Sequence, residues 1–109
     1  MPKKYKLYKI DYSNMCGGGN GNDINLYLFK ADWCGHCKHF KPIWENLQNF
    51  NSNINYITYD ADIDKNEIKK YKIDGYPTLI LVVNNNATEY QGPRTQKAIE
   101  HFLQKYIKV

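Results

Sequence analysis

The chain has 109 residues, of which 42% are hydrophobic and 24% are charged, and its formal net charge is +4. This length fits one domain, which we expect to span residues 1–109 and to fold without disulfide staples. Three cysteines are too few for a disulfide framework. No apolar run approaches the length of about 18 residues that a membrane span requires, so we expect no membrane-spanning segment.

The chain starts with a basic run between Lys3 and Lys9, where lysines are interleaved with Tyr5 and Tyr8. Cations interleaved with aromatic rings occur on nucleic-acid-binding surfaces. The same alternation is typical of a strand that has one exposed face. We favour a strand over residues 4–10 and expect no nucleic-acid partner.

The next segment, residues 11–23, is rich in glycine and asparagine, which predicts a flexible loop. Four strands are predicted after it: residues 24–29, 54–60, 78–83 and 87–90. The first of these is mostly apolar, which suits a central strand buried on both faces. Asn84, Asn85 and Asn86 predict a hairpin turn between the last two strands.

Between the strands, hydrophobic residues recur at helical spacing. In a helix beginning at Gly35 the apolar residues at this spacing are Phe40, Ile43, Trp44 and Leu47. Pro42 lies inside this helix, where it removes one hydrogen bond and kinks the axis. The segment Asp64 to Glu67 resembles a capping box that opens a short helix, and a last helix begins near Thr95.

This order of elements predicts an α/β fold with one mixed sheet and helices on both faces. Alternating strands and helices imply parallel pairing in the first part, and the hairpin adds an antiparallel edge. Cys34 then follows the central strand directly. Sites of open α/β sheets lie at the carboxyl ends of their strands, so its place favours a functional role.

The motif that carries chemistry is Trp33-Cys34-Gly35-His36-Cys37. A helix N-terminus favours an anion, so the pKa of the Cys34 thiol should fall below the free-thiol value of about 8.5. Cys34 is therefore the candidate nucleophile. Cys37, one turn further along, is the candidate resolving thiol, which attacks a mixed disulfide at Cys34. Because the two can form a disulfide, we expect no other cofactor.

The same part of the chain offers soft metal ligands, namely Cys16, Cys34, His36, Cys37 and His39. No second CxxC and no HxxxH pair accompanies them, and a zinc site would need Cys16 brought across from the loop. We therefore expect no metal. Cys16 is interpreted first as an inert thiol, with a second redox partner or a tether to another protein as alternatives.

The segment Trp33 to Lys38 resembles the active site of protein disulfide isomerase domains, and the chain from about Ile24 to its end resembles the thioredoxin fold. Pro42 matches the helix-kinking proline of that fold. The segment Tyr71 to Thr78 resembles the one that carries its cis-proline, here Pro77. The resemblance implies a thioredoxin-like mixed sheet flanked by helices, and a thiol–disulfide oxidoreductase that acts on protein cysteines.

The resemblance also implies roles for the residues around the cysteines. A cis Tyr76–Pro77 bond would present the Tyr76 backbone to an extended substrate, which would pair with it as an added strand. Gly35-His36 resembles the pair found in isomerases and oxidases, and a positive imidazole would make the disulfide a stronger oxidant. Arg94 resembles an arginine of isomerase domains that swings toward the second cysteine, whose pKa it would lower.

Two features depart from the family pattern. The family usually has a buried carboxylate six residues before the first cysteine, and here that position is Leu28. The lysine that usually pairs with the carboxylate, on the next strand, falls near Thr58 and is also missing. Proton removal from Cys37 must then rely on water, His36 or Arg94, which predicts slower release of mixed disulfides. The glycine-rich loop, moreover, stands where the fold normally has its first helix.

We interpret the chain as an oxidising or isomerising enzyme. A reducing thioredoxin-like reductase is one alternative, and an inactive thioredoxin-fold binding module, favoured by Leu28, is another. The expected partners are proteins with thiols or disulfides, and a redox partner such as glutathione or a separate reductase or oxidase. No signal peptide or retention signal is visible, so the default location is the cytoplasm, or the virion if the chain is viral.

Overall fold

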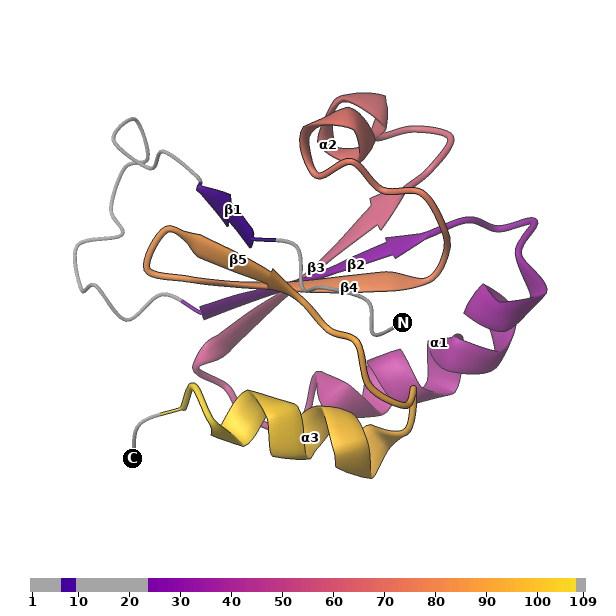
Figure 1. Cartoon of the computed structure of the whole chain (residues 1–109). Helices are drawn as coiled ribbons and strands as arrows, with labels where there is room; N and C mark the ends of the chain where they lie inside the picture. Colours follow the sequence, from indigo (N-terminus) through magenta and orange to yellow (C-terminus); the bar gives the residue numbers. More distant parts are fainter. Residues whose placement is uncertain (1–6, 10–23, 108–109) are drawn as a thin grey trace, which may run out of the picture.

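The structure is a computed structural model that describes residues 7–9 and 24–107 (Figure 1). Its strands are β1 (Leu7–Lys9), β2 (Ile24–Lys30), β3 (Ile54–Asp60), β4 (Thr78–Val83) and β5 (Asn86–Glu89). Its helices are α1 (Gly35–Leu47), α2 (Lys65–Lys70) and α3 (Gln96–Gln104). The predicted strands and helices between residues 24 and 107 are all present, with bounds close to those expected.

Part of the predicted organisation lies outside the described residues. Of the strand predicted over residues 4–10, residues 7–9 are described, as β1. The loop predicted over residues 11–23, its replacement of a first helix, and Cys16 fall outside the described part of the chain.

The five described strands form one mixed sheet in the order β1-β5-β4-β2-β3. The predicted parallel pairing is found between β2 and β3, where Leu28 lies opposite Thr58. The predicted antiparallel hairpin is formed by β4 and β5, and β4 also pairs antiparallel with β2. The prediction that this hairpin forms an edge of the sheet is wrong, because β1 pairs with β5 and is itself the edge strand. Because β1 pairs antiparallel with β5, parallel pairing in the described sheet is confined to β2 and β3.

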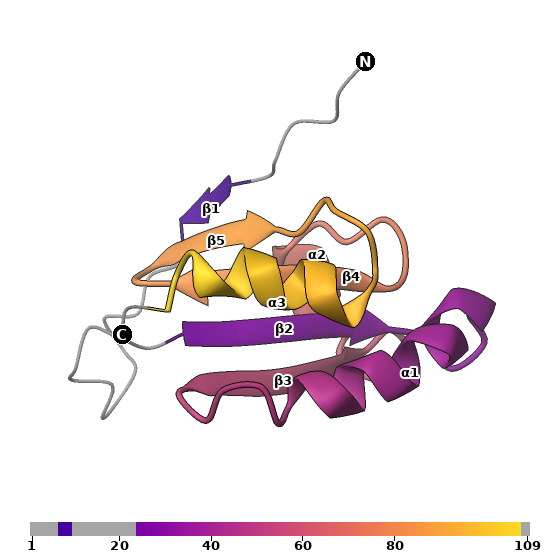
Figure 2. The ribbon, with the colours of Figure 1, turned by 90° about the horizontal axis from the view of Figure 1, so that it is seen from below.

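The helices cover both faces of the sheet, as predicted (Figures 1 and 2). Leu26 and Leu28 of β2 pack on one face with the buried side chains of α1 and α3. Tyr27 and Phe29 pack on the opposite face with Tyr71, which follows α2. All four β2 side chains are buried, so β2 is the predicted central strand buried on both faces. None of the helices within residues 24–107 has the length and apolar character of a membrane span.

The short connections follow local chemistry, with one exception. Thr95 caps α3, because its Oγ1 accepts a hydrogen bond from the Ala98 backbone N–H at 3.2 Å. The capping box predicted at Asp64 is wrong, although α2 begins where it was expected. The Asp64 side chain makes no bond to the α2 N-terminus. Its Oδ2 instead accepts from the backbone N–H of Asp60 at 2.8 Å, which ties the helix start to the end of β3.

The β4–β5 turn allows a test of how much its left-handed backbone angles contribute to stability. Asn84 and Asn85 have φ angles of 51° and 71°, a left-handed region that glycine and asparagine tolerate best. We expect Asn85→Ala to lower the free energy of unfolding by about 1–2 kcal/mol relative to Asn85→Gly. Chemical denaturation of both variants measures the difference. Equal losses in the two variants would mean that side-chain contacts of Asn85, rather than its backbone angle, stabilise the turn.

Candidate active site

The site is built where β2 ends and α1 begins. Cys34 is the N-cap residue of α1 and has an extended backbone, with φ −93° and ψ 119°. Its carbonyl accepts hydrogen bonds from the backbone N–H groups of Cys37 at 3.1 Å and Lys38 at 3.2 Å. Its own N–H donates to the Ala31 carbonyl at 3.1 Å. The change from strand to helix thus places the Cys34 sulfur at the positive end of α1, as the sequence predicts.

Cys34 is half-buried, and its surroundings favour the thiolate. Its pKa is lowered from the ordinary value, chiefly because the Cys37 backbone N–H donates to the sulfur. Partial desolvation opposes this shift, whereas the Cys37 side chain, the His36 backbone N–H and the Arg94 charge reinforce it. Cys34 is therefore the better nucleophile of the pair.

Cys37 has the opposite character. Its side chain is buried against the first turn of α1, and its sulfur accepts a hydrogen bond from the Ala31 backbone N–H at 3.5 Å. Burial raises the pKa of the Cys37 thiol to about 11, despite the opposing effects of the Ala31 N–H and the Arg94 charge. The structure holds both cysteines as free thiols, one accessible and one protected.

The loop before β4 supplies the other side of the site. The Cys34 thiol donates to the Tyr76 carbonyl at 3.5 Å, and the Tyr76–Pro77 peptide bond is cis. The Trp33 ring meets the Tyr76 ring edge-on, with 5.8 Å between their centroids. The Trp33 indole N–H also donates to Asp62 Oδ1 at 3.5 Å. Trp33, Cys34, Tyr76 and Pro77, which the sequence assigned to one site, are therefore neighbours.

The two residues between the cysteines are exposed. His36 acts on Cys34 through its backbone N–H, whereas the role predicted for its imidazole rests on the family resemblance. At Gly35 an added Cβ would meet nothing within 4 Å, so a side chain would fit at this position. His39 is exposed on α1.

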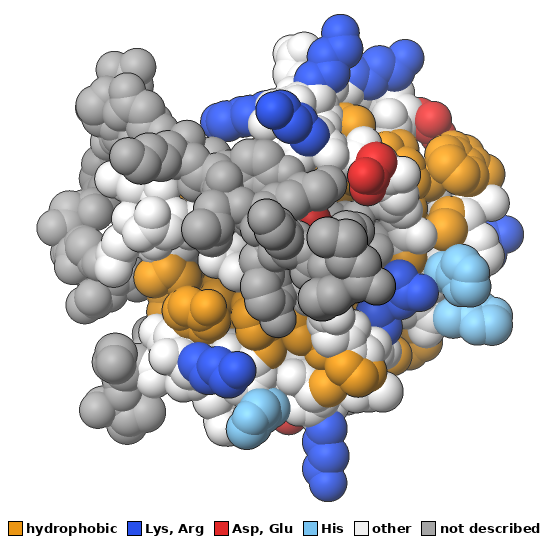
Figure 3. Space-filling model, viewed as in Figure 1, with side chains coloured by type: hydrophobic (Ala, Val, Ile, Leu, Met, Phe, Trp, Pro, Cys, Tyr) orange, Lys and Arg blue, Asp and Glu red, His pale blue; other side chains and the backbone are white. Residues whose placement is uncertain are grey.

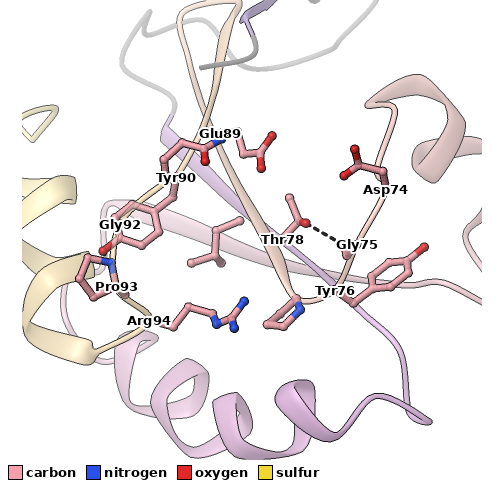
Figure 4. A pocket seen from close by; sticks show the side chains of 12 residues that line it. Asp74, Gly75, Tyr76, Thr78, Glu89, Tyr90, Gly92, Pro93 and Arg94 are labelled. Atoms are coloured by element: carbon pink, nitrogen blue, oxygen red, sulfur yellow. Dashed lines mark hydrogen bonds between the residues drawn. The ribbon is translucent and has the colours of Figure 1, made fainter. Parts of the chain in front are cut away.

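Arg94 lies beyond β5, in the segment that leads to α3, and is exposed. Together with Tyr76 and Pro77 it lines a pocket of about 480 Å³ (Figure 4). Tyr76 joins this pocket to the cysteines, because its carbonyl accepts from the Cys34 thiol. The positive charge of Arg94 lowers the pKa of both Cys34 and Cys37. The structure thus brings the sole arginine of the chain within electrostatic reach of both thiols, although it is 57 to 60 residues distant in sequence.

Sequence reasoning missed several polar residues around this site. Asp74, Glu89 and Gln91 also line the pocket, and Asp62 accepts the indole N–H of Trp33. The sequence could have indicated that Glu89 points inward. It lies two residues after the buried Ala87, and side chains two apart in a strand lie on the same face. Asp62 and Asp74 lie in loops between strands and helices, where no periodic pattern indicates which way a side chain points.

Leu28 and Thr58 stand where the family pattern has a buried carboxylate and a lysine. Leu28 is buried in the core beside α1 and α3. Thr58, which lies opposite it, accepts a hydrogen bond from the Trp44 indole N–H at 3.0 Å. An ion pair does occur two residues further along both strands, between Lys30 Nζ and Asp60 Oδ2 at 2.9 Å. The pKa of Lys30 is raised by its hydrogen bonds to Asp32 and then to Asp60, and the hydrogen bond to Lys30 lowers the pKa of Asp60.

The described residues include no group of three or more histidine, cysteine or carboxylate side chains arranged to hold a metal ion. The polar groups that contact the two sulfurs include the Tyr76 carbonyl, which accepts from the Cys34 thiol, and the Ala31 backbone N–H, which donates to Cys37. The chemistry that this arrangement supports is exchange at sulfur.

Comparison with known proteins identifies the class to which this fold and site belong. Residues 19–105 match the Thioredoxin family model, and the chain is a member of the thioredoxin family. Among its relatives, protein disulfide-isomerase 2-3 of Arabidopsis thaliana is 38% identical over 91 residues, which cover 82% of this chain and 21% of the relative. Protein disulfide-isomerase 1 of Caenorhabditis elegans is 37% identical over 81 residues, which cover 72% of this chain and 17% of the relative.

Solved structures agree with this assignment. The zinc-bound form of human ERp44 superposes with a TM-score of 0.70 at 30% identity, over 79% of this chain and 28% of ERp44. A mutant thioredoxin from Halobacterium salinarum NRC-1 superposes with a TM-score of 0.71 at 28% identity, over 81% of this chain and 78% of that one. The predicted isomerase-like thioredoxin fold is thus confirmed. The chain spans about a fifth of the length of the isomerases it matches, and these relatives support thiol–disulfide oxidoreductase chemistry.

The difference between the two thiols can be measured directly. On a Cys16→Ser background, we expect the pH dependence of alkylation to show a Cys34 thiolate that forms below the pKa of an ordinary cysteine. The Cys37 thiolate should form only near pH 11. Mass spectrometry after a short pulse of iodoacetamide identifies which thiol has reacted. Two thiols that titrate together in the ordinary range would contradict the assignment of nucleophile and resolving thiol.

Proposed function

We propose that this domain is a thiol–disulfide oxidoreductase of the isomerase or oxidase type, acting on cysteines of other proteins. The observation that carries the proposal is the pairing of two unlike thiols. Cys34 is accessible and has a lowered pKa, whereas Cys37, one helical turn away, is buried with a pKa of about 11. Exchange through a mixed disulfide needs this division between an attacking and a resolving sulfur.

The steps follow from the geometry. In the reducing direction, the Cys34 thiolate attacks one sulfur of a substrate disulfide, an S–S bond to the substrate forms, and the other substrate sulfur leaves as a thiolate. Cys37 then loses its proton and attacks the Cys34 sulfur. This releases the second substrate thiolate and leaves the Cys34–Cys37 disulfide, so the substrate gains the two electrons that the dithiol loses.

The same steps run backward to oxidise a substrate dithiol. A substrate thiolate attacks the Cys34 sulfur of the Cys34–Cys37 disulfide, and Cys37 leaves as a thiolate that takes up a proton. A second substrate thiolate then attacks the substrate sulfur of the mixed disulfide, which forms the substrate disulfide and releases the Cys34 thiolate. Isomerisation results when another cysteine of the substrate attacks the mixed disulfide before Cys37 does, and no net electrons are transferred. A separate redox partner, such as glutathione or a dedicated reductase or oxidase, returns the pair to its starting state.

The Gly35-His36 pair supports the oxidising or isomerising direction. Stabilisation of the Cys34 thiolate stabilises the reduced form of the pair, which makes the disulfide a stronger oxidant. The N-terminus of α1 and the Arg94 charge already stabilise the Cys34 thiolate, and a protonated His36 imidazole would stabilise it further.

The surface around Cys34 supports a protein substrate. Among the described residues, the large hydrophobic side chains that are exposed are Trp33, at 66%, and Ile63, at 77%. The Trp33 indole N–H donates to Asp62, the residue before Ile63. Both exposed side chains thus follow the carboxyl ends of the parallel strands β2 and β3, the end at which Cys34 lies. Figure 3 shows hydrophobic and histidine side chains together at the end where β2 passes into α1. An extended peptide that pairs with the Tyr76 backbone would pass over this surface.

The inactive binding module is favoured by one observation, the replacement of the family carboxylate by the buried Leu28. Without a nearby carboxylate, deprotonation of Cys37 relies on water, His36 or the Arg94 charge. Both sulfurs, Trp33 and Pro77 are nevertheless in place, and we favour a slower resolving step over a loss of activity.

The reduction potential of the Cys34–Cys37 couple tests the direction of the reaction. On a Cys16→Ser background, equilibration with glutathione should give a potential near about −180 mV, as in isomerases, and not near about −270 mV, as in thioredoxin. His36→Pro should make the disulfide harder to reduce. A potential in the thioredoxin range would favour the reductase, and an unchanged potential in His36→Pro would remove the imidazole from the tuning of the site.

Trapping of mixed disulfides tests whether proteins are the substrates. Because Cys37 resolves the intermediate, Cys37→Ser should accumulate disulfides between Cys34 and a reduced, unfolded test protein under oxidising conditions. Non-reducing electrophoresis and mass spectrometry identify these adducts. The control is the double variant Cys34→Ser with Cys37→Ser. Both variants of the domain also carry Cys16→Ser, so that the control has no cysteine and should form no adduct. If Cys37→Ser traps no more than this control, the exchange mechanism is wrong.

A further inference from the structure

The segment that carries Arg94 is anchored at both ends. At its start, the Tyr90 backbone N–H donates to the Leu79 carbonyl of β4 at 2.9 Å. At its end, Thr95 caps α3, and its carbonyl accepts from the Ile99 N–H at 3.1 Å. Between these anchors the residues are half-buried or exposed. Contacts made by the segment's own side chains therefore help to set its position.

The principal contact of this kind is made by the Tyr90 side chain. Its hydroxyl donates to the Pro93 carbonyl at 2.5 Å, which is the peptide group immediately before Arg94. Its ring packs against Phe102 of α3, with 5.0 Å between the ring centroids and an interplanar angle of 58°. Because α3 fixes the ring, the hydroxyl is a fixed donor around which the segment turns.

Gly92 shows how closely the segment follows this ring. A Cβ added at Gly92 would lie 2.6 Å from the Tyr90 hydroxyl oxygen and 2.8 Å from the ring carbon that bears it. Real Cβ atoms do not approach other atoms so closely, so a side chain at this position would displace the tyrosine or the backbone. The absence of a side chain at Gly92 therefore lets the chain pass over the ring and return to the hydroxyl at Pro93.

Arg94 reaches into the pocket from the end of this turn. In Figure 4 its guanidinium group points across the pocket toward the loop of Tyr76. From this position its charge acts on both thiols. Two carboxylates line the same pocket, Asp74 from the loop before β4 and Glu89 from β5. Figure 4 shows Glu89 at the end of the pocket away from Arg94.

We propose that Tyr90 is a positioning residue for the active site: its ring, held on α3, and its bond to the Pro93 carbonyl direct Arg94 toward the cysteine pair. The proposal rests on the proposed function, since it assigns to Tyr90 a part in setting the reactivity of Cys34 and Cys37. Without the bond, the segment would lose a fixed point one residue before Arg94. The guanidinium would then be free to move into water or toward Asp74 and Glu89, away from the thiols.

The test removes the hydroxyl and keeps the ring. On a Cys16→Ser background, Tyr90→Phe should raise the pH at which the Cys34 thiolate forms. It should also slow the attack of Cys37 on the mixed disulfide at neutral pH by about three- to tenfold, the range expected for one hydrogen bond. Thiolate absorbance against pH measures the first effect, and rapid-mixing release of a reduced peptide from its mixed disulfide measures the second.

A matched control comes from the same aromatic cluster. Tyr106 packs on Phe102 as well, with 5.5 Å between the ring centroids, but lies beyond α3 and away from the Arg94 segment. Tyr106→Phe also removes one hydroxyl from a ring that contacts Phe102, and it should change neither the thiolate titration nor the rate of release. Equal effects of Tyr90→Phe and Tyr106→Phe would indicate a general loosening of α3 and would overturn the proposal.

Combination with Arg94→Ala shows whether Tyr90 acts through the arginine. If it does, Tyr90→Phe should produce no further change once Arg94 is alanine. If the two effects multiply, or if Tyr90→Phe has no effect alone, the proposal is wrong. Should Tyr90→Phe fail to fold, Gly92→Ala disturbs the same contact with Tyr90 intact, and the same dependence on Arg94 decides the outcome.

The readouts also separate this proposal from the proposed function. The thiolate titration observes Cys34 directly and requires no substrate. If the unmodified domain exchanges no protein disulfides, the proposed function fails, and the titration of Tyr90→Phe still tests the link between Tyr90 and Arg94.

Discussion

The site depends on one constraint, the conversion of the central strand β2 into helix α1 within a few residues. Cys34 occupies the turning point, with an extended backbone whose carbonyl already accepts the first bonds of α1. The free N–H groups of a helix start are donors that need an acceptor, and the Cys34 sulfur accepts from those of His36 and Cys37. Because β2 is buried on both faces, this turning point cannot shift, and the sulfur is held where the Tyr76 loop and the Arg94 segment meet.

Much of the fold and the core of the site could be predicted from local patterns. The apolar run of β2, the helical spacing of α1 and the asparagines of the β4–β5 turn each specify their own geometry. The capping box at Asp64 failed because its carboxylate has a competing donor, the Asp60 N–H, which sequence spacing does not reveal. The pairing of β1 with β5, the bond from Trp33 to Asp62 and the contact of Tyr90 with Pro93 arise from tertiary packing or loop geometry, for which no periodic signal exists.

The replacement of a buried ion pair by Leu28 and Thr58 changes the physical character of the sheet below the cysteines. A buried pair of charges needs excellent geometry to offset the loss of hydration, whereas Leu28 packs among apolar neighbours. Thr58 meets its hydrogen-bonding need with the Trp44 indole. Leu28 and Thr58 therefore bring no charge to these two positions, and the ion pair of the two strands, Lys30 with Asp60, lies two residues further along. The Arg94 charge, carried by the segment after β5, is the formal positive charge that acts on both sulfurs.

The unequal thiols also determine how protons accompany electrons. At a pH between their two pKa values, reduction of the disulfide leaves Cys34 as a thiolate and gives a proton to Cys37 alone. The couple then takes up two electrons and one proton, so its potential falls by about 30 mV for each pH unit. A pair of ordinary thiols takes up two protons and changes by about 59 mV. The stabilisation of the Cys34 thiolate, beside a Cys37 thiol that stays protonated, thus makes the oxidising strength of this domain less sensitive to pH than that of an ordinary thiol pair.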